Sequence, residues 1–344
     1  MPSPPQQDLE LFRMLTGYMP AFLIGAALQL DIPEAIGEST RTTGELARAT
    51  STHEPSLIRM LRALAALGLL AEDEPGAFRL TPRGTLLRAG TPGSMHGMAT
   101  VLLDESMWGA WPALDHAVRT GERAFDHVFG TDYMSYTGFA DGSSMREHID
   151  QAMLDETRLV APSIVDSYDF GPFSTIVDIG GGSGPLAAAV LAANPHLRGV
   201  VFDTADGVAL APRVLTEAGV ADRCEVRTGD FFESLPSGDL YLCKSVVFNW
   251  AADEQVSAIF ANCREVIPDR GRFLLVEQML PAAVDGSVPA HVYVDDLGSI
   301  VNVGGRHRTE PEYRALLAGA GFELTVHPLP TTPSGYSLLE AVPR

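Results

Sequence analysis

From residue 174 to its end, the chain alternates between apolar runs of β-type composition and helical stretches. Strands that alternate with helices form parallel sheets, because two parallel strands need a crossover connection rather than a tight turn. The sequence therefore predicts an α/β domain whose sheet is covered by helices on both faces. The predicted strands are 175–179, 199–202, 224–227, 239–243 and 272–277, and the predicted helices are 185–193, 208–218, 253–266 and 310–320.

Two further β-type runs close the chain, at 322–327 and 336–341. They are near enough in the sequence to form an antiparallel hairpin, which we place at the edge of the sheet. Five parallel strands and this hairpin predict a Rossmann-like, mixed sheet of seven strands.

The N-terminal part has a different pattern, in which helices dominate. Thr42 and Glu45 have the spacing of a capping box at the start of a short helix. An amphipathic helix is predicted over 54–67, and two short strands at 69–72 and 78–80 follow it as a β-hairpin. Helix, turn, helix and hairpin in this order predict a mostly helical winged-helix domain.

Mixed helical stretches join this part to the α/β domain, at 108–119 and 144–168. We therefore predict three regions. They are a winged-helix domain over 1–100, a helical linking region over 101–173, and an α/β domain over 174–344.

Charge and cysteine usage limit the partners. The formal net charge is −20, so nucleic acid and anionic membranes are not expected as partners, and the winged-helix pattern is better explained by dimerisation than by DNA binding. The three cysteines have no paired spacing, which predicts thiols in a reducing cytoplasm. The longest apolar run, 19–30, is too short to span a bilayer, so no membrane is expected.

A glycine-rich turn follows the first predicted strand, where residues 178–184 have the sequence D-I-G-G-G-S-G. Glycines allow a tight turn and close approach of a ligand, and the helix that follows presents free N–H groups. In dinucleotide sites a pyrophosphate lies over such a helix. Asp178 would repel a pyrophosphate, and its carboxylate suits the cationic amino group of an amino-acid-like ligand.

The next two strands are also followed by acidic residues. Asp203 ends the second strand, where a carboxylate can hold a ribose diol. Asp230 and Phe231 follow the third strand, and a carboxylate beside an aromatic ring suits adenine. Together with the glycine turn, these residues describe a nucleoside that carries a cationic amino-acid tail, which is S-adenosylmethionine (SAM).

Further motifs accompany this set: L-C-K-S at 242–245, F-N-W at 248–250, G-G-R-H-R-T at 304–309 and A-G-F at 320–322. Over nearly its whole length the chain resembles the class I SAM-dependent O-methyltransferases that act on plant phenolics and bacterial aromatic natural products. The resemblance implies a homodimer formed through the domain at 1–100, a region at 101–173 that covers the substrate, and a SAM-binding domain at 174–344. It also implies glycines along the methionine moiety, a carboxylate on the ribose and a carboxylate–aromatic pair on the adenine. The residues implied to bind the cofactor are Asp178, Gly180, Gly182, Asp203, Asp230, Phe231, Lys244 and Ser245.

One departure from the family pattern concerns the catalytic base. The family has a histidine after its Leu-Lys motif, which takes the proton of the substrate hydroxyl. Here Phe248 stands at that position, and Asn249 replaces the usual aspartate. Because phenylalanine cannot accept a proton, we expect transfer to depend largely on proximity between acceptor and methyl group.

A second departure places His307 where the family has a glutamate. In plant relatives that glutamate and the one matching Glu277 flank the catalytic histidine. His307, Glu277 and Asn249 are therefore the candidate catalytic residues, and a histidine can act as a base near neutral pH. We expect Arg306 and Arg308 to lower the pKa of His307, and a surface or supporting role for His307 stays open.

Aromatic residues crowd the linking region, where they form either core or the wall of an acceptor pocket. The residues implied to contact the substrate are Trp108, Phe129, Met153, Phe248 and Asn302. A metal set made of His291, Asp295 and Asp296 is conceivable, but this spacing is generic and no metal is predicted.

The predicted function is methyl transfer from SAM to a small aromatic or phenolic natural-product acceptor. Phe248 keeps two alternatives open on the same scaffold: C-methylation, or a SAM-bound reaction without methylation, such as hydroxylation, decarboxylation or a pericyclic step. A winged-helix regulator that senses a small ligand is a third class. The acidic charge and the full set of cofactor residues argue against it.

Overall fold

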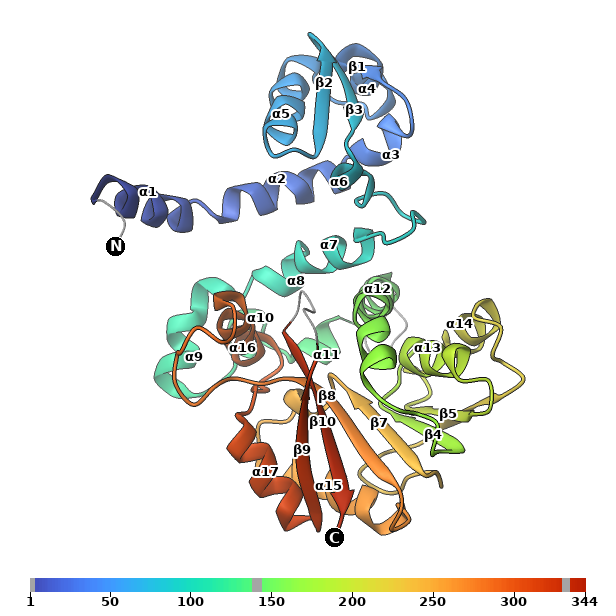
Figure 1. Cartoon of the computed structure of the whole chain (residues 1–344). Helices are drawn as coiled ribbons and strands as arrows, with labels where there is room; N and C mark the ends of the chain where they lie inside the picture. The colour runs from blue at the N-terminus through green and yellow to red at the C-terminus, as the bar shows by residue number, and fades with distance from the viewer. Residues whose placement is uncertain (1–3, 138–143, 330–334) are drawn as a thin grey trace. The chain divides into compact units, whose positions relative to one another are not determined.

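A computed structural model of the chain describes residues 4–137, 144–329 and 335–344 (Figure 1). It divides into two compact units, one made of Met1–Trp108 and Gln151–Asp155, the other of Gly109–Asp150 and Glu156–Arg344. The long helix α12 (Ser144–Ser167) contributes residues to both units. The domain boundaries that we placed at 100 and 173 stay predictions.

The first unit has the expected order of helices and hairpin. Thr42 caps α4, and the capping box with Glu45 is confirmed. Strands β2 and β3 form the hairpin, and a two-residue strand β1, which the sequence did not predict, pairs with β3. The elements are α1 (Pro4–Leu15), α2 (Tyr18–Gln29), α3 (Ile32–Ile36), β1 (Arg41–Thr42), α4 (Thr43–Ala49), α5 (Glu54–Ala66), β2 (Leu70–Glu74), β3 (Ala77–Leu80), α6 (Pro82–Thr85), α7 (His96–Leu102) and α8 (Glu105–Trp108).

Helices α1 and α2 expose apolar side chains that the isolated chain does not cover. The core of this unit surrounds Leu61 and Phe78, which are fully buried, whereas α2 buries only Ala27 of its twelve residues. A row of exposed apolar groups on a helix indicates a surface that another partner covers. The exposed side chains are Leu9, Leu11, Phe12, Met14, Leu15, Tyr18, Met19 and Phe22.

The same stretch bears on the expectation about membranes. By length and composition the helical segment Asp8–Gln29 is apolar enough to cross a bilayer, with a mean hydropathy of 1.4. The apolar run at 19–30 is too short by itself, and the segment reaches this length because residues of α1 precede it. A single such segment near the N-terminus is weak evidence for a membrane span.

The second unit begins with short helices rather than with the predicted helix over 108–119. Helix α8 ends at Trp108 in the first unit, and the residues after it form the 3-10 helix η1 (Trp111–Ala113) and α9 (Leu114–Thr120). Gly109 and Pro112 explain the interruption, because both residues disfavour a continuous helix. Helices α10 (Ala124–Phe129) and α11 (Tyr133–Tyr136) follow.

The second unit contains the predicted mixed sheet of seven strands, in the order β6-β5-β4-β7-β8-β10-β9. Strands β4 to β8 are parallel, and β10 runs antiparallel between β8 and β9 (Figure 1). The strands are β4 (Thr175–Ile179), β5 (Arg198–Asp203), β6 (Cys224–Thr228), β7 (Leu240–Lys244), β8 (Arg272–Gln278), β9 (Phe322–Pro328) and β10 (Tyr336–Pro343). The other elements are α13 (Pro185–Ala193), α14 (Ala211–Glu217), η2 (Val247–Asn249), α15 (Asp253–Val266), α16 (Ala290–Asn302) and α17 (Glu310–Gly319).

The sheet topology places the candidate site. The chain leaves β4 toward β5 on one side, and it later adds β7 and β8 on the other side. In open α/β sheets, ligands bind at the carboxyl ends of the strands where the order reverses in this way. The point of reversal lies between β4 and β7, so the glycine turn after β4 meets the residues that follow β7.

Candidate active site

The glycine turn after β4 has the geometry that its sequence requires. Gly180 and Gly182 both have positive φ angles, 64° and 53°, which glycine adopts without strain. A Cβ atom on Gly180 would lie 2.6 Å from Cγ2 of Val246, so the turn packs closely against the residues after β7. Glycine at position 180 therefore allows the turn after β4 to lie directly against the residues after β7.

Asp178 lies beneath this turn. Its side chain is buried, and Oδ2 accepts a hydrogen bond from the backbone N–H of Ala187 in the first turn of α13. Burial raises the pKa of this carboxyl to about 7. Asp178 therefore supports the turn from below, and direct contact with a ligand, as the sequence suggested, stays a prediction.

Asp203 joins the tip of β5 to the glycine turn. Its Oδ2 accepts a hydrogen bond of 2.9 Å from the N–H of Gly182, and its Oδ1 accepts one from Thr204. Each carboxylate oxygen can accept a second bond. The partly exposed carboxylate is therefore available to hydroxyl groups of a ligand at this edge.

The adenine candidates lie after β6. Asp230 is exposed, and its Oδ1 accepts a hydrogen bond from the N–H of Phe232. Phe231 is partly buried and packs against the rings of Phe232 and Trp250, with centroid distances of 4.9 Å and 6.3 Å. These contacts fix the Phe231 ring at the edge of the sheet.

Lys244 and Ser245 belong to a closed network at the end of β7. Nζ of Lys244 lies 2.7 Å from Oε2 of Glu156 on α12 and donates to Oγ of Ser245 at 3.2 Å. The hydroxyl of Tyr336 donates to Oε1 of Glu156, and it also bonds to Ser245 at 2.8 Å. Sequence reasoning missed Glu156 and Tyr336. The available signal was that Lys244 is the only lysine of the chain, and a buried lysine needs a carboxylate.

Glu277 and Asn249 hold the turn that carries Phe248. Oε1 of Glu277 accepts hydrogen bonds from the N–H groups of Val246 and Val247, and its side chain is fully buried. Nδ2 of Asn249 donates to the carbonyl oxygens of Ser245 and Val246. These bonds give both side chains a positioning role toward the turn.

The loop at 304–309 is fastened to the same turn. The N–H of Arg306 donates to the carbonyl oxygen of Phe248 at 2.8 Å, and a Cβ atom on Gly305 would overlap that oxygen. The guanidinium of Arg308 is fully buried and donates to the carbonyl oxygens of Trp250 and Ala251. These contacts hold the Phe248 turn and the 304–309 loop against each other.

His307 is brought against Phe248 by this pairing. The two rings stack with a centroid distance of 5.4 Å and an interplanar angle of 18°. The backbone N–H of His307 donates to Oδ1 of Asp296, the residue is 8% exposed, and its Nδ1 has no hydrogen-bond partner among the described residues. The structure thus places His307 inside the site and not on the surface.

The pKa of His307 is lowered, as predicted, but the predicted cause was wrong. Burial lowers the pKa, while the carboxylates of Asp296 and Asp295 act in the opposite direction. Arg306 pairs with Asp253 and Glu312, and Arg308 also pairs with Asp253. The two guanidinium charges are therefore neutralised by these partners.

The predicted substrate residues are distributed over both units. Trp108 and Met153 belong to the first unit, where the Trp108 ring packs against Phe22. Phe129 and Asn302 belong to the second, where Phe129 stacks on Phe125 at 4.4 Å and Asn302 is buried on α16. Their contact with a substrate stays a prediction.

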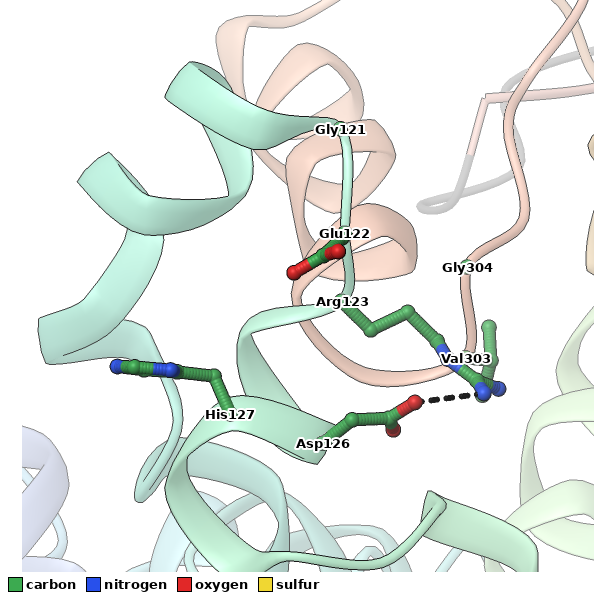
Figure 2. Close-up of a pocket in the computed structure, with 7 residues that line it drawn as sticks. All are labelled: Gly121, Glu122, Arg123, Asp126, His127, Val303 and Gly304. Atoms are coloured by element: carbon green, nitrogen blue, oxygen red, sulfur yellow. Dashed lines mark ion pairs between the residues drawn. The ribbon is translucent and has the colours of Figure 1, made fainter.

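A separate polar cavity of about 580 Å³ lies next to the start of the 304–309 loop (Figure 2). Arg123 packs over Gly304 and pairs with Asp126 at 2.7 Å. Across residues 4–137, 144–329 and 335–344, no three His, Cys, Asp or Glu side chains are grouped as metal ligands, so the metal alternative gains no support. The lining residues of the cavity are Gly121, Glu122, Arg123, Asp126, His127, Val303 and Gly304.

Comparison with known proteins identifies the family. An O-methyltransferase domain matches residues 111–323, and an O-methyltransferase dimerisation domain matches residues 12–90. The chain is 40% identical to O-demethylpuromycin-O-methyltransferase of Streptomyces alboniger, over 97% of this chain and 88% of the relative. It is 39% identical to phenazine O-methyltransferase PhzM of Lysobacter antibioticus, over 97% and 95% of the two chains. The chain belongs to the O-methyltransferase family.

Solved structures agree with this assignment. The crystal structure of LaPhzM matches with a TM-score of 0.89 at 38% identity, covering 98% of this chain and 99% of the other. An O-methyltransferase of neocarzinostatin biosynthesis, solved with SAM and 2-hydroxy-5-methyl naphthoic acid, matches with a TM-score of 0.75 at 29% identity, covering 94% and 96%. The protein is a SAM-dependent methyltransferase with the predicted fold, and SAM is its cofactor.

The residues at the sheet edge fit this cofactor. A Cβ atom on Gly182 would meet no atom within 4 Å, so the space over the turn is open. Asp203 faces that turn and can accept bonds from ribose hydroxyls. When bound, SAM supplies a methyl group on a positively charged sulfur.

The buried carboxyl of Glu277 predicts a pH dependence of stability. Burial raises its pKa from 4.5 to about 7, so the folded state binds the proton more tightly than the unfolded state. The free energy of unfolding therefore falls as the pH rises from about 4.5 to about 7. Glutamine at 277 does not titrate. As the pH rises through this range, the free energy of unfolding of Glu277→Gln should therefore increase by up to about 3 kcal/mol relative to that of wild type.

Urea unfolding at a series of pH values between 5 and 8 measures this difference. Glu254→Gln, on an exposed residue of α15, is the matched control and should follow the wild-type curve. If the difference in free energy of unfolding between Glu277→Gln and wild type does not change with pH, the raised pKa of Glu277 is contradicted.

Proposed function

We propose that the enzyme transfers the methyl group of SAM to a hydroxyl of a small aromatic, phenolic natural product. The relatives support this acceptor class by their names, which include 3-amino-4-hydroxybenzoate 4-O-methyltransferase of Streptomyces cremeus, at 33% identity. They also include 2,7-dihydroxy-5-methyl-1-naphthoate 7-O-methyltransferase of Streptomyces carzinostaticus, at 31% identity. Such acceptors place the reaction in secondary metabolism.

Proximity supplies most of the rate in this proposal, and Phe248 is the observation that carries it. The ring occupies the family's base position, and its turn is fixed by Glu277, Asn249 and the 304–309 loop. The acceptor oxygen would form the new C–O bond while the methyl C–S bond breaks and its electron pair passes to sulfur, and the hydroxyl proton would leave to water or to an acceptor in the site. A site that holds the reacting atoms in line supplies several kcal/mol toward this displacement.

The second candidate is different chemistry on the same scaffold, and the same Phe248 favours it. Aclacinomycin 10-hydroxylase RdmB of Streptomyces purpurascens is 29% identical to the chain over 98% of its length. C-methylation, hydroxylation, decarboxylation and a pericyclic step are the outcomes to separate from O-methylation. The mass and connectivity of the product distinguish them.

The first experiment incubates the enzyme with SAM and a panel of phenols that includes 3-amino-4-hydroxybenzoate and 1,4-dihydroxy-2-naphthoic acid. We expect one O-methylated product by mass spectrometry and NMR. An oxidised, decarboxylated or C-methylated product would replace the first candidate by the second.

Asp203→Ala should weaken SAM binding in calorimetry about 10- to 100-fold, because ribose hydroxyls lose a charged acceptor. Asp206→Ala, on an exposed neighbour, is the control and should bind SAM normally. Unchanged SAM affinity in Asp203→Ala would remove Asp203 from the proposed site.

We also propose a cytoplasmic homodimer. The three cysteines are free thiols, which suits a reducing compartment. The exposed apolar side chains of α1 and α2 lie where the dimerisation domain matches, and a second copy of the chain would cover them.

Light scattering at micromolar concentration should therefore give about twice the chain mass of 36.8 kDa. Phe12→Asp should shift the protein toward the monomer, because it puts a charge into the apolar contact. Arg13→Ala, on the adjacent exposed residue, should not shift it. A monomeric wild type would refute the dimer.

A further inference from the structure

The starting observation is an unsatisfied nitrogen inside the site. Nδ1 of His307 is buried and has no hydrogen-bond partner in the part of the chain that the structure describes. A buried polar atom left without a partner costs about 1–3 kcal/mol, so native structures keep few of them. Nδ1 has almost no exposed surface, so a ligand that donates a hydrogen bond to it must displace a neighbouring side chain, and this bond would then remove the cost.

The ring is held in one orientation. It stacks on Phe248 on one face, and its backbone N–H is fixed by Asp296. The ring also bonds to the backbone of Gln278. Because Nδ1 has no partner, that bond belongs to Nε2, whose N–H donates to a carbonyl oxygen. This tautomer leaves a lone pair on Nδ1, which is then an acceptor.

The charged groups around the ring come from three elements. Helix α16 presents Asp295 and Asp296, whose carboxylates favour the protonated ring. The same helix carries His291, which acts on Asp295 together with His307. On strand β8, the carboxyl of Glu277 is turned toward the backbone of the Phe248 turn. On the loop itself, Arg306 and Arg308 are paired with Asp253. The η2 turn contributes the uncharged Phe248.

Burial outweighs these carboxylates, so the pKa of His307 lies below its usual value of 6.5. At neutral pH the ring is therefore unprotonated and ready to accept a proton. Once it is protonated, the two carboxylates on α16 stabilise the imidazolium.

Resting on the proposed function, we propose that Nδ1 of His307 receives the proton of the acceptor hydroxyl during methyl transfer. The hydroxyl donates a hydrogen bond to Nδ1, and its oxygen forms the C–O bond as the methyl C–S bond breaks. The electron pair of the C–S bond passes to sulfur, and the O–H proton passes to Nδ1, which becomes N–H. The base has thus moved from the turn at 248 to the loop at 307.

This base adds to proximity and does not replace it. A base with a lowered pKa is weak, so its contribution belongs at the low end of the usual range for general bases. We expect His307→Ala to lower kcat about 10- to 100-fold with a phenol that is neutral at the assay pH.

The first arm of the test uses the best phenol of the panel and a nitro-substituted analogue that is ionised at neutral pH. His307→Ala and His307→Asn should both lower kcat for the neutral phenol and leave kcat for the ionised analogue within a few-fold of wild type. Asparagine can accept a hydrogen bond near Nδ1 but cannot take the proton. The proposal would be overturned if His307→Asn kept the wild-type kcat with the neutral phenol. It would also be overturned if the variants lowered kcat equally with both acceptors.

The second arm measures binding without turnover. The same neutral phenol is titrated into the S-adenosylhomocysteine complex of wild type and of His307→Ala at a series of pH values. Wild-type affinity should fall as the pH drops below the pKa of His307, because the protonated ring no longer accepts a hydrogen bond, whereas the affinity of His307→Ala should not change with pH. A pH-independent wild type would contradict the proposal. If the phenol binds in this way but no methylated product forms, the proposed function fails while the contact to His307 stands.

Discussion

The buried guanidinium of Arg308 is the interaction on which the site depends. An arginine with 0% exposure must have every donor directed at an acceptor, because an unpaired buried charge is costly. Here the acceptors are carbonyl oxygens at the end of the Phe248 turn and the carboxylate of Asp253. The loop that carries His307 is thereby fixed to the turn that carries Phe248.

The same framework extends to the cofactor side. The Phe248 turn is braced from below by Glu277, and through Val246 it packs against Gly180 of the glycine turn. The glycine turn is in turn held by Asp203 at the tip of β5. Residues that would hold SAM and residues that would hold the acceptor therefore share one chain of contacts. A displacement on one side changes the distance between the reacting atoms.

Local sequence patterns predicted the elements that carry the site but not the contacts between them. Strand β4 and helix α15 have the predicted bounds, because their apolar spacing is regular. Helix α16 was missed, since its Val, Tyr and Ile residues favour strands. The bonds of Arg308 and Glu277 to distant backbone groups depend on how strands and loops meet in space. His307 was named from a resemblance, and only the structure showed its stacking and its unpaired Nδ1.

Gly305 offers the most direct test of this coupling, because a Cβ atom there would overlap the carbonyl oxygen of Phe248. Steady-state kinetics of Gly305→Ala with the best phenol should show kcat at least about tenfold lower, since small misplacements are costly in a proximity-driven reaction. SAM binding in calorimetry should be near wild type. Gly319→Ala, at a glycine with no atom within 4 Å of the added Cβ, should have wild-type kcat. Wild-type kcat in Gly305→Ala would contradict the claim that the fastened turn and loop set the geometry of transfer.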